Sequence, residues 1–534
     1  MRVLGIEGTA WAASAALYDG PTDTVHIETE AYQPESGGIH PREAAEHMAE
    51  YLPKVAESVL SKAQAQSDGR PVDAVAFSRG PGLGPCLRLA GTTARAVAQR
   101  LDVPLVGVNH MVAHLEIGRH RSGLSSPVCL NASGANAHIL GYRTGRYRVL
   151  GETMDTGVGN AIDKFTRHVG WSHPGGPKVE QAATDSEYVG LPYVVKGMDF
   201  SFSGIMSAAK DAVDNGTPVE DVCHGLQENI FAMLTEVSER ALSLTGSDEL
   251  VLGGGVGQNQ RLQSMLASMC AQRGADFFVP GNRFLRDNAG MIAVLGSKMY
   301  AADDTVAIDA SAIDSEFRPD QVPVTWRGAN KQPDTNSGVD KQTVTGAEAT
   351  VTINDKRVIK QRNPREYRHP VLDERLREER TRQEARLTSK ARNAGVPTPL
   401  VLDVDVEETT LTFQHVGDVD LREALSVEHV ETVARHLGRI HEAGFVHGDP
   451  TTRNVRVECD TDRGWVFLID FGLGYYTENP EDHAMDLHVL SQSLAGTDDD
   501  ADKLMDAAEV AYSTVGNETV IDQLREIEAR GRYQ

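Results

Sequence analysis

The chain has 534 residues, a formal net charge of −25, and hydrophobic residues make up 40% of it. This length exceeds one ordinary hydrophobic core and predicts a multi-domain protein. No run approaches the roughly eighteen apolar residues of a membrane span, and the first residues lack a signal-peptide pattern. We therefore expect a cytoplasmic protein that does not bind a membrane.

The acidic excess, 77 Asp and Glu against 52 Lys and Arg, argues against a nucleic-acid partner by the usual rule. Acid-rich surfaces also keep proteins soluble in concentrated salt, where the Debye length is only about 3 Å at 1 M. We favour a halophilic source, so the charge does not exclude RNA. The five cysteines are isolated and form no CxxC pair, which is typical of a protein in a reducing compartment. We expect their side chains to be buried.

Short apolar runs that end in glycine or polar turns alternate with helical patterns over residues 1–327, which predicts an α/β domain. The expected strands lie at residues 3–6, 74–77, 104–108, 128–130 and 250–252. Residues 328–343 are polar and rich in Asn, Asp, Gln and Gly, which is typical of a linker. A second domain is expected over residues 344–534.

The start of this second domain is locally basic. Residues 356–392 contain 13 basic and 6 acidic side chains. One interpretation is a solvated helix with ion pairs four residues apart. The other is a docking surface for an acidic partner or an RNA backbone.

Three turns of small residues follow expected strands, at residues 5–10, 132–136 and 253–259. Such turns let backbone amides approach a phosphate or ribose, and the dipole of the following helix favours the negative charge. One turn alone is a common strand-to-helix connection. Three in this order are expected of an actin-like, two-lobed nucleotide-binding fold.

His110 and His114 are four residues apart, so on a helix both imidazoles can reach one metal ion. A zinc-protease motif is excluded because Met111 stands where that motif has its general-base Glu. Asp287, before an apolar helical pattern, is a candidate third ligand. The alternatives are a packed or capping histidine and an ordinary Asp N-cap.

Ten segments together resemble the universal tRNA threonylcarbamoyladenosine transferase family, in order over nearly all of residues 1–325. They are residues 5–10, 37–48, 78–88, 109–118, 133–136, 151–167, 173–180, 199–204, 253–259 and 286–293. The resemblance implies an actin-like (ASKHA) α/β fold with two lobes. It also implies that threonylcarbamoyl-AMP, made by a separate enzyme, binds between the lobes and donates its acyl group to an anticodon-loop adenosine of tRNA.

The same resemblance implies roles for individual residues. His110, His114 and Asp287 would bind one divalent metal, with iron favoured over zinc. The adenylate contacts would be Asn131, Ala132, Ser133, Gly134, Ala135, Asp163, Gly176, Glu180 and Asn259. Archaeal relatives commonly have a tyrosine metal ligand where this chain has Asn131, a weaker neutral donor, and a glycine where it has Ala135. The first departure leaves the identity of the metal open.

The second half contains kinase-like motifs. Asp449 and Asn454 have the spacing of a kinase catalytic loop, in which the Asp positions the nucleophile and the Asn holds Mg²⁺. Asp470 begins a DFG sequence, and Lys360 and Glu384 are candidates for the strand lysine and its helix partner. ATP and Mg²⁺ are therefore the expected ligands.

Two parts of the kinase pattern are missing, because only Gly346 remains of the glycine loop and no APE motif follows the DFG. Residues 344–534 resemble the small atypical serine/threonine kinase of the KEOPS complex, which is fused to the transferase in some archaea. That resemblance implies other small KEOPS subunits as partners. A protein kinase and a regulatory ATPase both remain open.

Two other functions compete with this interpretation. The first is an actin-like small-molecule kinase or ATPase, although such folds usually hold Mg²⁺ without imidazole ligands. The second is a scaffold with an inactive kinase half. The intact Lys360, Asp449, Asn454 and Asp470 argue against the second.

Overall fold

The computed structural model divides by its contacts into two compact units. It describes residues 1–32, 40–67, 69–134, 136–143, 145–327, 343–346, 348–354, 356–459, 464–498 and 500–530. Unit 1 comprises Met1–Pro192, Ser201–Leu234 and Ser247–Pro333. Unit 2 comprises Tyr193–Phe200, Thr235–Gly246 and Asp334–Gln534. The linker expected at residues 328–343 lies, except for Thr343, outside the described residues.

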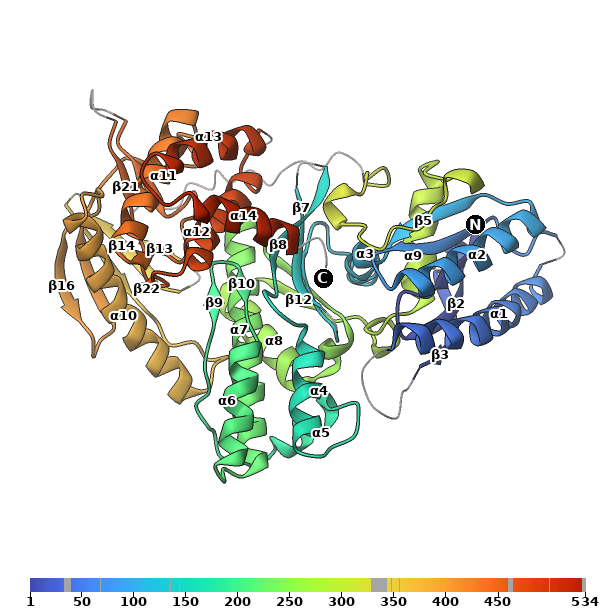
Figure 1. The fold of residues 1–534 in the computed structure, drawn as a ribbon. Coiled ribbons are helices and arrows are strands. Elements are labelled where there is room, and N and C mark those ends of the chain that lie inside the picture. The colour runs from blue at the N-terminus through green and yellow to red at the C-terminus, as the bar shows by residue number, and fades with distance from the viewer. Residues whose placement is uncertain are drawn as a thin grey trace. The chain divides into compact units, whose positions relative to one another are not determined.

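The first sheet of unit 1 has the strand order β3-β2-β1-β4-β5 (Figure 1). Its strands are β1 (Arg2–Glu7), β2 (Ala12–Asp19), β3 (Thr24–Ala31), β4 (Ala74–Gly80) and β5 (Leu105–Asn109). The β1 strand pairs antiparallel with β2 and parallel with β4, and β4 pairs parallel with β5. Alternating residues face opposite cores: Leu4 and Ile6 pack with helices α1 (Pro41–Ala65) and α2 (Gly84–Leu101), and Val3 packs with α9 (Ala289–Ala301).

The second sheet of unit 1 repeats this plan in the order β8-β7-β6-β11-β12. Its strands are β6 (Val128–Ala132), β7 (Ala137–Arg143), β8 (Arg146–Glu152), β11 (Glu249–Gly253) and β12 (Asp276–Phe278). Again the first strand pairs antiparallel on one side and parallel on the other. The five strands expected from the sequence are all present, and the two mixed sheets with their helices match the expected α/β class.

Further helices of unit 1 connect these strands. They are α3 (His110–Ser122), α4 (Val158–His168), α5 (Gly176–Ala182), α6 (Ser203–Asp214) and α8 (Gln260–Arg273). Helix α7 (Val219–Thr245) contains the boundary between the two units. Single 3-10 turns occur at Gly20–Thr22, Gly255–Gln258, Asn282–Phe284, Ile308–Ala310 and Pro319–Gln321.

Unit 2 begins with a five-stranded antiparallel sheet in the order β13-β14-β15-β17-β16. Its strands are β13 (Thr343–Thr345), β14 (Thr350–Asn354), β15 (Arg357–Gln361), β16 (Val401–Asp405) and β17 (Thr410–Gln414). Helix α10 (Pro370–Asn393) contacts β16 and β17. The hairpin of β9 (Val195–Lys196) and β10 (Asp199–Phe200) also belongs to this unit.

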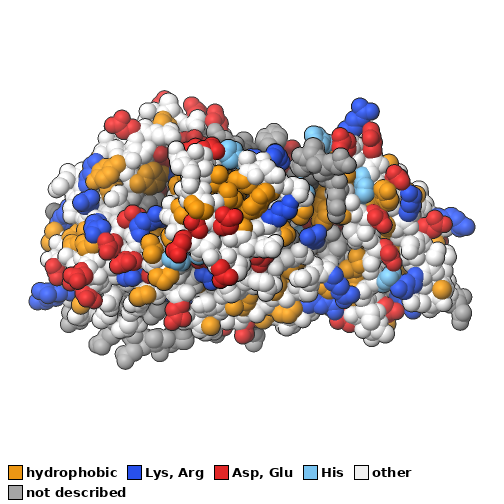
Figure 2. Space-filling view, turned by 90° about the horizontal axis from the view of Figure 1, so that it is seen from below, with side chains coloured by type: hydrophobic (Ala, Val, Ile, Leu, Met, Phe, Trp, Pro, Cys, Tyr) orange, Lys and Arg blue, Asp and Glu red, His pale blue; other side chains and the backbone are white. Residues whose placement is uncertain are grey.

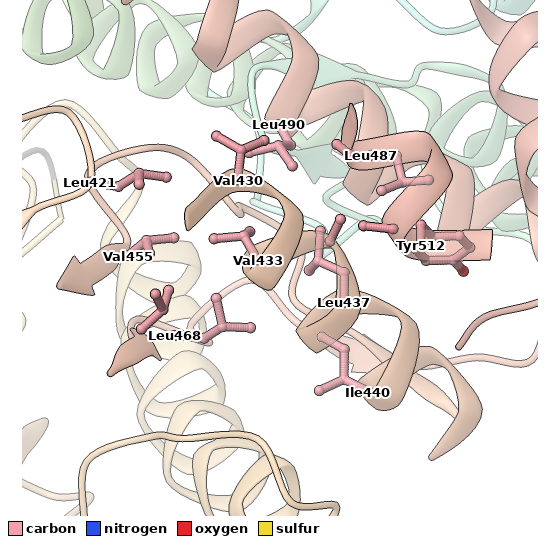
Figure 3. Packing of buried hydrophobic residues seen from close by; sticks show 14 of the residues in the cluster. Leu421, Val430, Val433, Leu437, Ile440, Val455, Leu468, Leu487, Leu490 and Tyr512 are labelled. Atoms are coloured by element: carbon pink, nitrogen blue, oxygen red, sulfur yellow. The ribbon is translucent and has the colours of Figure 1, made fainter. Parts of the chain in front are cut away.

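The rest of unit 2 is mainly helical, with two small antiparallel sheets. Its elements are β18 (Val419–Asp420), α11 (Val427–Glu442), β19 (Phe445–Val446), β20 (Val455–Val457), β21 (Val466–Leu468), β22 (Tyr475–Tyr476), α12 (Pro480–Ala495), α13 (Ala501–Ser513) and α14 (Thr519–Arg530). Figure 3 shows the core of this part. Val430, Val433, Leu437 and Ile440 follow the helical repeat along α11 and are fully buried.

Acidic side chains share the surface with basic and apolar ones. On the face drawn in Figure 2, acidic and basic side chains lie among apolar ones. No helix in the described part of the chain is long and apolar enough to cross a membrane.

The expectation that all five cysteines are buried is wrong for Cys459, which is exposed on a loop after β20, whereas the other four are buried.

Leu437→Ala should lower the free energy of unfolding of unit 2 by about 2–5 kcal/mol, because it leaves a cavity in a fully packed core. Native-state hydrogen exchange of the α11 amides measures this change. The control is Val510→Ala, at a side chain that is 71% exposed, and it should change the value by less than about 0.5 kcal/mol. Equal effects of the two substitutions would contradict the assignment of the core.

Candidate functional site

The sequence brings two imidazoles and one carboxylate together from two helix starts. Asn109, the last residue of β5, caps α3 with its side-chain oxygen, so His110 and His114 lie on the first two turns of that helix. Asp287 lies just before α9. The helix is capped by Asn288 rather than by Asp287, so the alternative of an Asp N-cap is wrong.

The three ligand atoms converge on one point. Asp287 Oδ1 is 3.3 Å from His110 Nε2 and 3.3 Å from His114 Nε2. All three atoms lie within 4.8 Å of one another. Two imidazole nitrogens and one carboxylate oxygen form a donor set that suits iron(II) or zinc. The residues therefore fit a divalent transition metal.

Burial and charge act in opposite directions on these side chains. Burial disfavours the charged form of His110, but the carboxylates of Glu7 and Asp287 outweigh it and raise the pKa of His110 to about 10. At His114 burial prevails and lowers the pKa. The pKa of Asp287 is lowered because the two imidazoles outweigh the effect of burial. Asp287 therefore pairs by charge with His110 and by a hydrogen bond with His114.

Asn131 lies at the end of β6, opposite Gly253 of β11 and His138 of β7. Its Nδ2 is 3.3 Å from His138 Nε2. Burial, with the nearby His114 and His110, lowers the pKa of His138 to about 3, so this imidazole is neutral and accepts the hydrogen bond. The buried Asn131 Oδ1 has no hydrogen-bond partner among the described residues, which leaves one acceptor for a ligand or water.

The small-residue loop after β6 is held from two sides. Ser133 Oγ donates to Asn136 O at 2.9 Å, and Gly134 O accepts from the amide of Asn160 in α4. A Cβ on Gly159 would lie 2.7 Å from Gly134 Cα, so this position needs glycine. The preceding Ala132 is buried, and Ala135 lies outside the described residues.

The glycine turn after β11 approaches the end of β6. Gly254 has φ 84°, and a Cβ on it would lie 2.2 Å from the carbonyl oxygen of Ala132. The turn leads to Asn259, which caps α8 and accepts from the amides of Arg261 and Leu262. Two of the three expected turns thus meet at the carboxyl ends of neighbouring parallel strands, where α/β sheets commonly bind ligands.

The remaining expected adenylate contacts lie on two connected segments. Asp163 of α4 accepts from the amide of Gly175 at 2.7 Å and pairs with His173 at 3.1 Å. Gly176 begins α5, and Glu180 near its end accepts from the amide of Gln260 at 2.7 Å. Backbone hydrogen bonds therefore fix both carboxylates.

In unit 2, three kinase-motif side chains form one ion-paired group. Lys360 Nζ is 3.0 Å from both carboxylate oxygens of Glu384 and 2.6 Å from Asp470 Oδ1. Arg362 also donates to Glu384 from a fully buried position. Gly346 lies in the turn between β13 and β14, where its amide donates to Ala349 O at 2.9 Å.

Asp449 and Asn454 face each other in the loop after β19. Asn454 Nδ2 donates to Asp449 Oδ2 at 2.9 Å. Burial raises the pKa of Asp449 to about 6; Arg240 opposes this shift, whereas Asp470 and Glu348 reinforce it. A carboxylate that titrates near neutrality is suited to accept a proton.

Arg240 is a residue that sequence reasoning missed, because it lies outside every kinase motif. Its guanidinium donates to Gly197 O at 3.0 Å and to the carboxylates of Glu236 and Glu348. The amide of Gly197 in turn donates to Gly448 O, next to Asp449. No local pattern signals the contacts of Arg240 with Glu348 and of Gly197 with Gly448, which join residues more than 100 positions apart.

Asp486 of α12 was also missed. Its two carboxylate oxygens accept from the amides of His447 and Gly448 at 2.7 and 2.8 Å. Gly448 has φ 82°, and a Cβ there would lie 2.3 Å from Leu473 O, so the loop that contains Asp449 passes very close to the segment after Asp470. An acid on an apolar helix that starts soon after a DFG sequence was the available signal.

The basic segment of residues 356–392 fits neither expectation alone. Arg377 and Arg382 make the expected ion pairs four residues apart. Arg368 and Arg380, by contrast, are buried against Glu236 of α7. Burial opposes ionisation of Glu236, but the surrounding arginines lower its pKa to about 2, and Arg380 has the largest effect among them. Part of the basic charge therefore neutralises buried carboxylates within unit 2.

Known proteins resemble this chain over its whole length. The family model described as tRNA N6-adenosine threonylcarbamoyltransferase matches residues 23–294. A protein of Haloarcula marismortui called "Probable bifunctional tRNA threonylcarbamoyladenosine biosynthesis protein" is 70% identical, with 100% of each chain covered. A protein of Halobacterium salinarum with the same name is 69% identical, covering 100% of this chain and 99% of that protein.

Solved structures resemble the chain only distantly. Full-length HypF in the phosphate- and nucleotide-bound form has 13% identity and a TM-score of 0.40, covering 56% of this chain and 55% of that chain. This likeness is too weak to inform the site.

Replacing His114 or Asp287 by Ala should abolish stoichiometric binding of a divalent transition metal, because only two of the three converging donors then remain. Metal content of the purified protein, measured by mass spectrometry, checks this. His120→Ala is the matched control, since His120 lies on the same helix but pairs with Asp23 at 2.8 Å. Full metal content in both site variants would exclude this metal site.

Proposed function

Because the chain belongs to the tRNA N6-adenosine threonylcarbamoyltransferase family, we propose that residues 1–327 transfer the threonylcarbamoyl group from threonylcarbamoyl-AMP to tRNA. The acceptor is N6 of the adenosine next to the anticodon (position 37) in tRNAs that read ANN codons. In this reaction the N6 amine attacks the carbamoyl carbonyl, a new C–N bond forms, the C–O bond to the phosphate breaks, and AMP leaves. The amine loses one proton, which passes to solvent.

The convergence of His110, His114 and Asp287 carries this proposal. Asp287 Oδ1 lies 3.3 Å from both imidazoles, and the donor set favours one divalent ion, with iron preferred to zinc. Such an ion, when bound, polarises the carbonyl and stabilises the charge on the departing AMP. The imidazoles disfavour the alternative of an actin-like small-molecule kinase, because Mg²⁺ prefers oxygen ligands.

The chain's own residues would bind and orient the adenylate. The loop at Ser133 and Gly134 would lie against phosphate oxygens with the Gly134 amide as the donor, because the Ser133 amide already donates to Asn136 O. Asp163 and Glu180, each fixed by one backbone hydrogen bond, would accept hydrogen bonds from ribose hydroxyls. Asn131 Oδ1 and the turn before Asn259 would complete the contacts. These side chains fix the carbonyl before the amine arrives, which reduces the entropic cost of the reaction.

For residues 344–534 we propose an ATP-dependent activity with Asp449 as the residue that positions the nucleophile. Lys360, held by Glu384, would contact the ATP phosphates, and Asp470 with Asn454 would bind Mg²⁺. A serine/threonine kinase and an ATPase share this chemistry. The short distance along the chain between Gly472 and α12, which begins at Pro480, favours the ATPase, because it leaves little chain to bind a peptide substrate.

We further propose that the protein works in the cytoplasm with other small subunits of a KEOPS-like complex.

The decisive experiment supplies tRNA, threonine, bicarbonate, ATP and a separate adenylate-forming enzyme, with the candidate partner subunits. Mass spectrometry of digested tRNA should detect threonylcarbamoyladenosine with this chain and with the His120→Ala control, but not with Asp287→Ala. Unmodified tRNA with the wild-type chain and every partner present would overturn the proposal.

The ATP-dependent activity should have an acid limb near pH 6, because Asp449 has to be deprotonated and its pKa is about 6. Arg240 lowers this pKa, so Arg240→Gln should move the limb to higher pH, whereas Arg240→Lys, which keeps the charge, should move it less. Asp449→Asn should abolish turnover at every pH. ATP hydrolysis from pH 5 to 9 measures all three.

The control for this experiment is Arg261→Gln, which removes an arginine paired with Glu228 in unit 1. It should leave the pH profile unchanged. An acid limb that stays in place in Arg240→Gln would show that Arg240 has no electrostatic effect on Asp449.

A further inference from the structure

The segment from the end of β1 to the start of β2 lies directly behind the proposed metal ligands. Glu7, the last residue of β1, is fully buried. Its Oε1 accepts from the Thr9 amide at 2.8 Å and from Thr9 Oγ1 at 2.6 Å. Its Oε2 is 3.1 Å from His110 Nδ1. The hydrogen bonds from Thr9 to Oε1 thus fix the orientation of the Glu7 carboxylate, and Oε2 faces His110.

A second side chain of the same segment reaches another ligand. Trp11 Nε1 donates to Asp287 Oδ2 at 2.9 Å, across 276 positions of sequence. The guanidinium of Arg286 lies 5.7 Å from the centre of the Trp11 ring. Asp287 therefore has one oxygen, Oδ2, engaged by the indole, and the other, Oδ1, facing the two imidazoles.

The backbone around this segment is tightly packed against the start of α9. A Cβ on Gly5 would lie 2.4 Å from the carbonyl oxygen of Ala289. Ser14 Oγ of β2 accepts from the amide of Ala289 at 3.1 Å. Because Asp287 lies two residues before Ala289, the β1–β2 hairpin and the third ligand are held at a fixed separation.

We propose that Glu7 and Trp11 are positioning residues of the metal site, a role that rests on the proposed function of that site. A hydrogen bond from His110 Nδ1–H to Glu7 selects the tautomer whose Nε2 lone pair faces the other donors. The indole N–H occupies Asp287 Oδ2 and limits this carboxylate to a single ligating oxygen. His114 lacks comparable support: its Nδ1 has no hydrogen-bond partner among the described residues.

This arrangement has a chemical consequence for the ion. The carboxylate of Glu7 would increase the electron density that His110 offers to an ion, and the Trp11 indole would leave Oδ1 as the ligating oxygen of Asp287. Three protein donors would leave room at the ion for an oxygen of the substrate. A site that lost Trp11 would bind the ion through both oxygens of Asp287 and would have one open position fewer.

The test uses Co²⁺ alone as the probe, because its visible absorption intensity falls as the coordination number rises. Trp11→Phe keeps the ring but removes the N–H. It should weaken Co²⁺ binding about 10-fold or more and lower the absorption intensity. Glu7→Gln should weaken binding about 10–100-fold. Matched controls are Trp171→Phe and Glu46→Gln, the latter in an exposed pair with Arg42; both should bind like the wild type.

The outcomes separate this proposal from the function of the site. Circular dichroism is used to check that Trp11→Phe is folded. The test then rests on this variant even if substitution of the fully buried Glu7 prevents folding. A folded Trp11→Phe with wild-type Co²⁺ affinity and spectrum overturns the positioning role, as does a wild-type chain that binds no Co²⁺. If the wild type binds Co²⁺ and the variants weaken it as expected, the proposal stands even where the tRNA assay finds no transfer, and only the proposed reaction fails.

Discussion

The carboxylate of Asp287 between the imidazoles of His110 and His114 is the interaction on which the candidate site of unit 1 depends. Burying any one of these groups without a partner would cost several kcal/mol, so each requires the others. Their positions follow from the first sheet, since His110 lies just beyond β5 and Glu7 ends the parallel strand β1. Helix α9, packed on that sheet, brings Asp287 to the same edge. The duplicated second sheet supplies the small-residue loops in the same way.

Unit 2 depends on a different balance of buried charge. Glu236 is almost completely buried, and Arg240, Arg368 and Arg380 all pair with it. Three cations around one carboxylate leave excess positive charge, which Glu348 offsets by pairing with Arg240 and Arg380. The same Arg240 lowers the pKa of Asp449. Arg240, which lies in the stretch that the transferase family model matches, therefore stabilises the charged form of Asp449.

The sequence predicted the features that are local. Apolar runs located the five expected strands, and four-residue spacing placed His110 and His114 on one helix. It could not predict Trp11 bonding to Asp287 or Arg240 contacting Glu348, because these pairs depend on how distant segments pack. Glu7 was visible inside the first small-residue turn. Its contact with His110 could not be predicted, because the two residues are far apart in the sequence and only the fold brings them together.

The two candidate sites differ in the atoms that they offer to a cation. In unit 1 the donors are two imidazole nitrogens and one oxygen, a set that suits borderline transition metals and binds Mg²⁺ poorly. In unit 2, Asp470, Asn454 and the ATP phosphates would offer oxygen alone, which suits Mg²⁺. Donor chemistry can therefore direct different ions to the two sites. The proposed acyl transfer and the proposed ATP chemistry would then be compatible in one chain, because neither site would favour the other's metal.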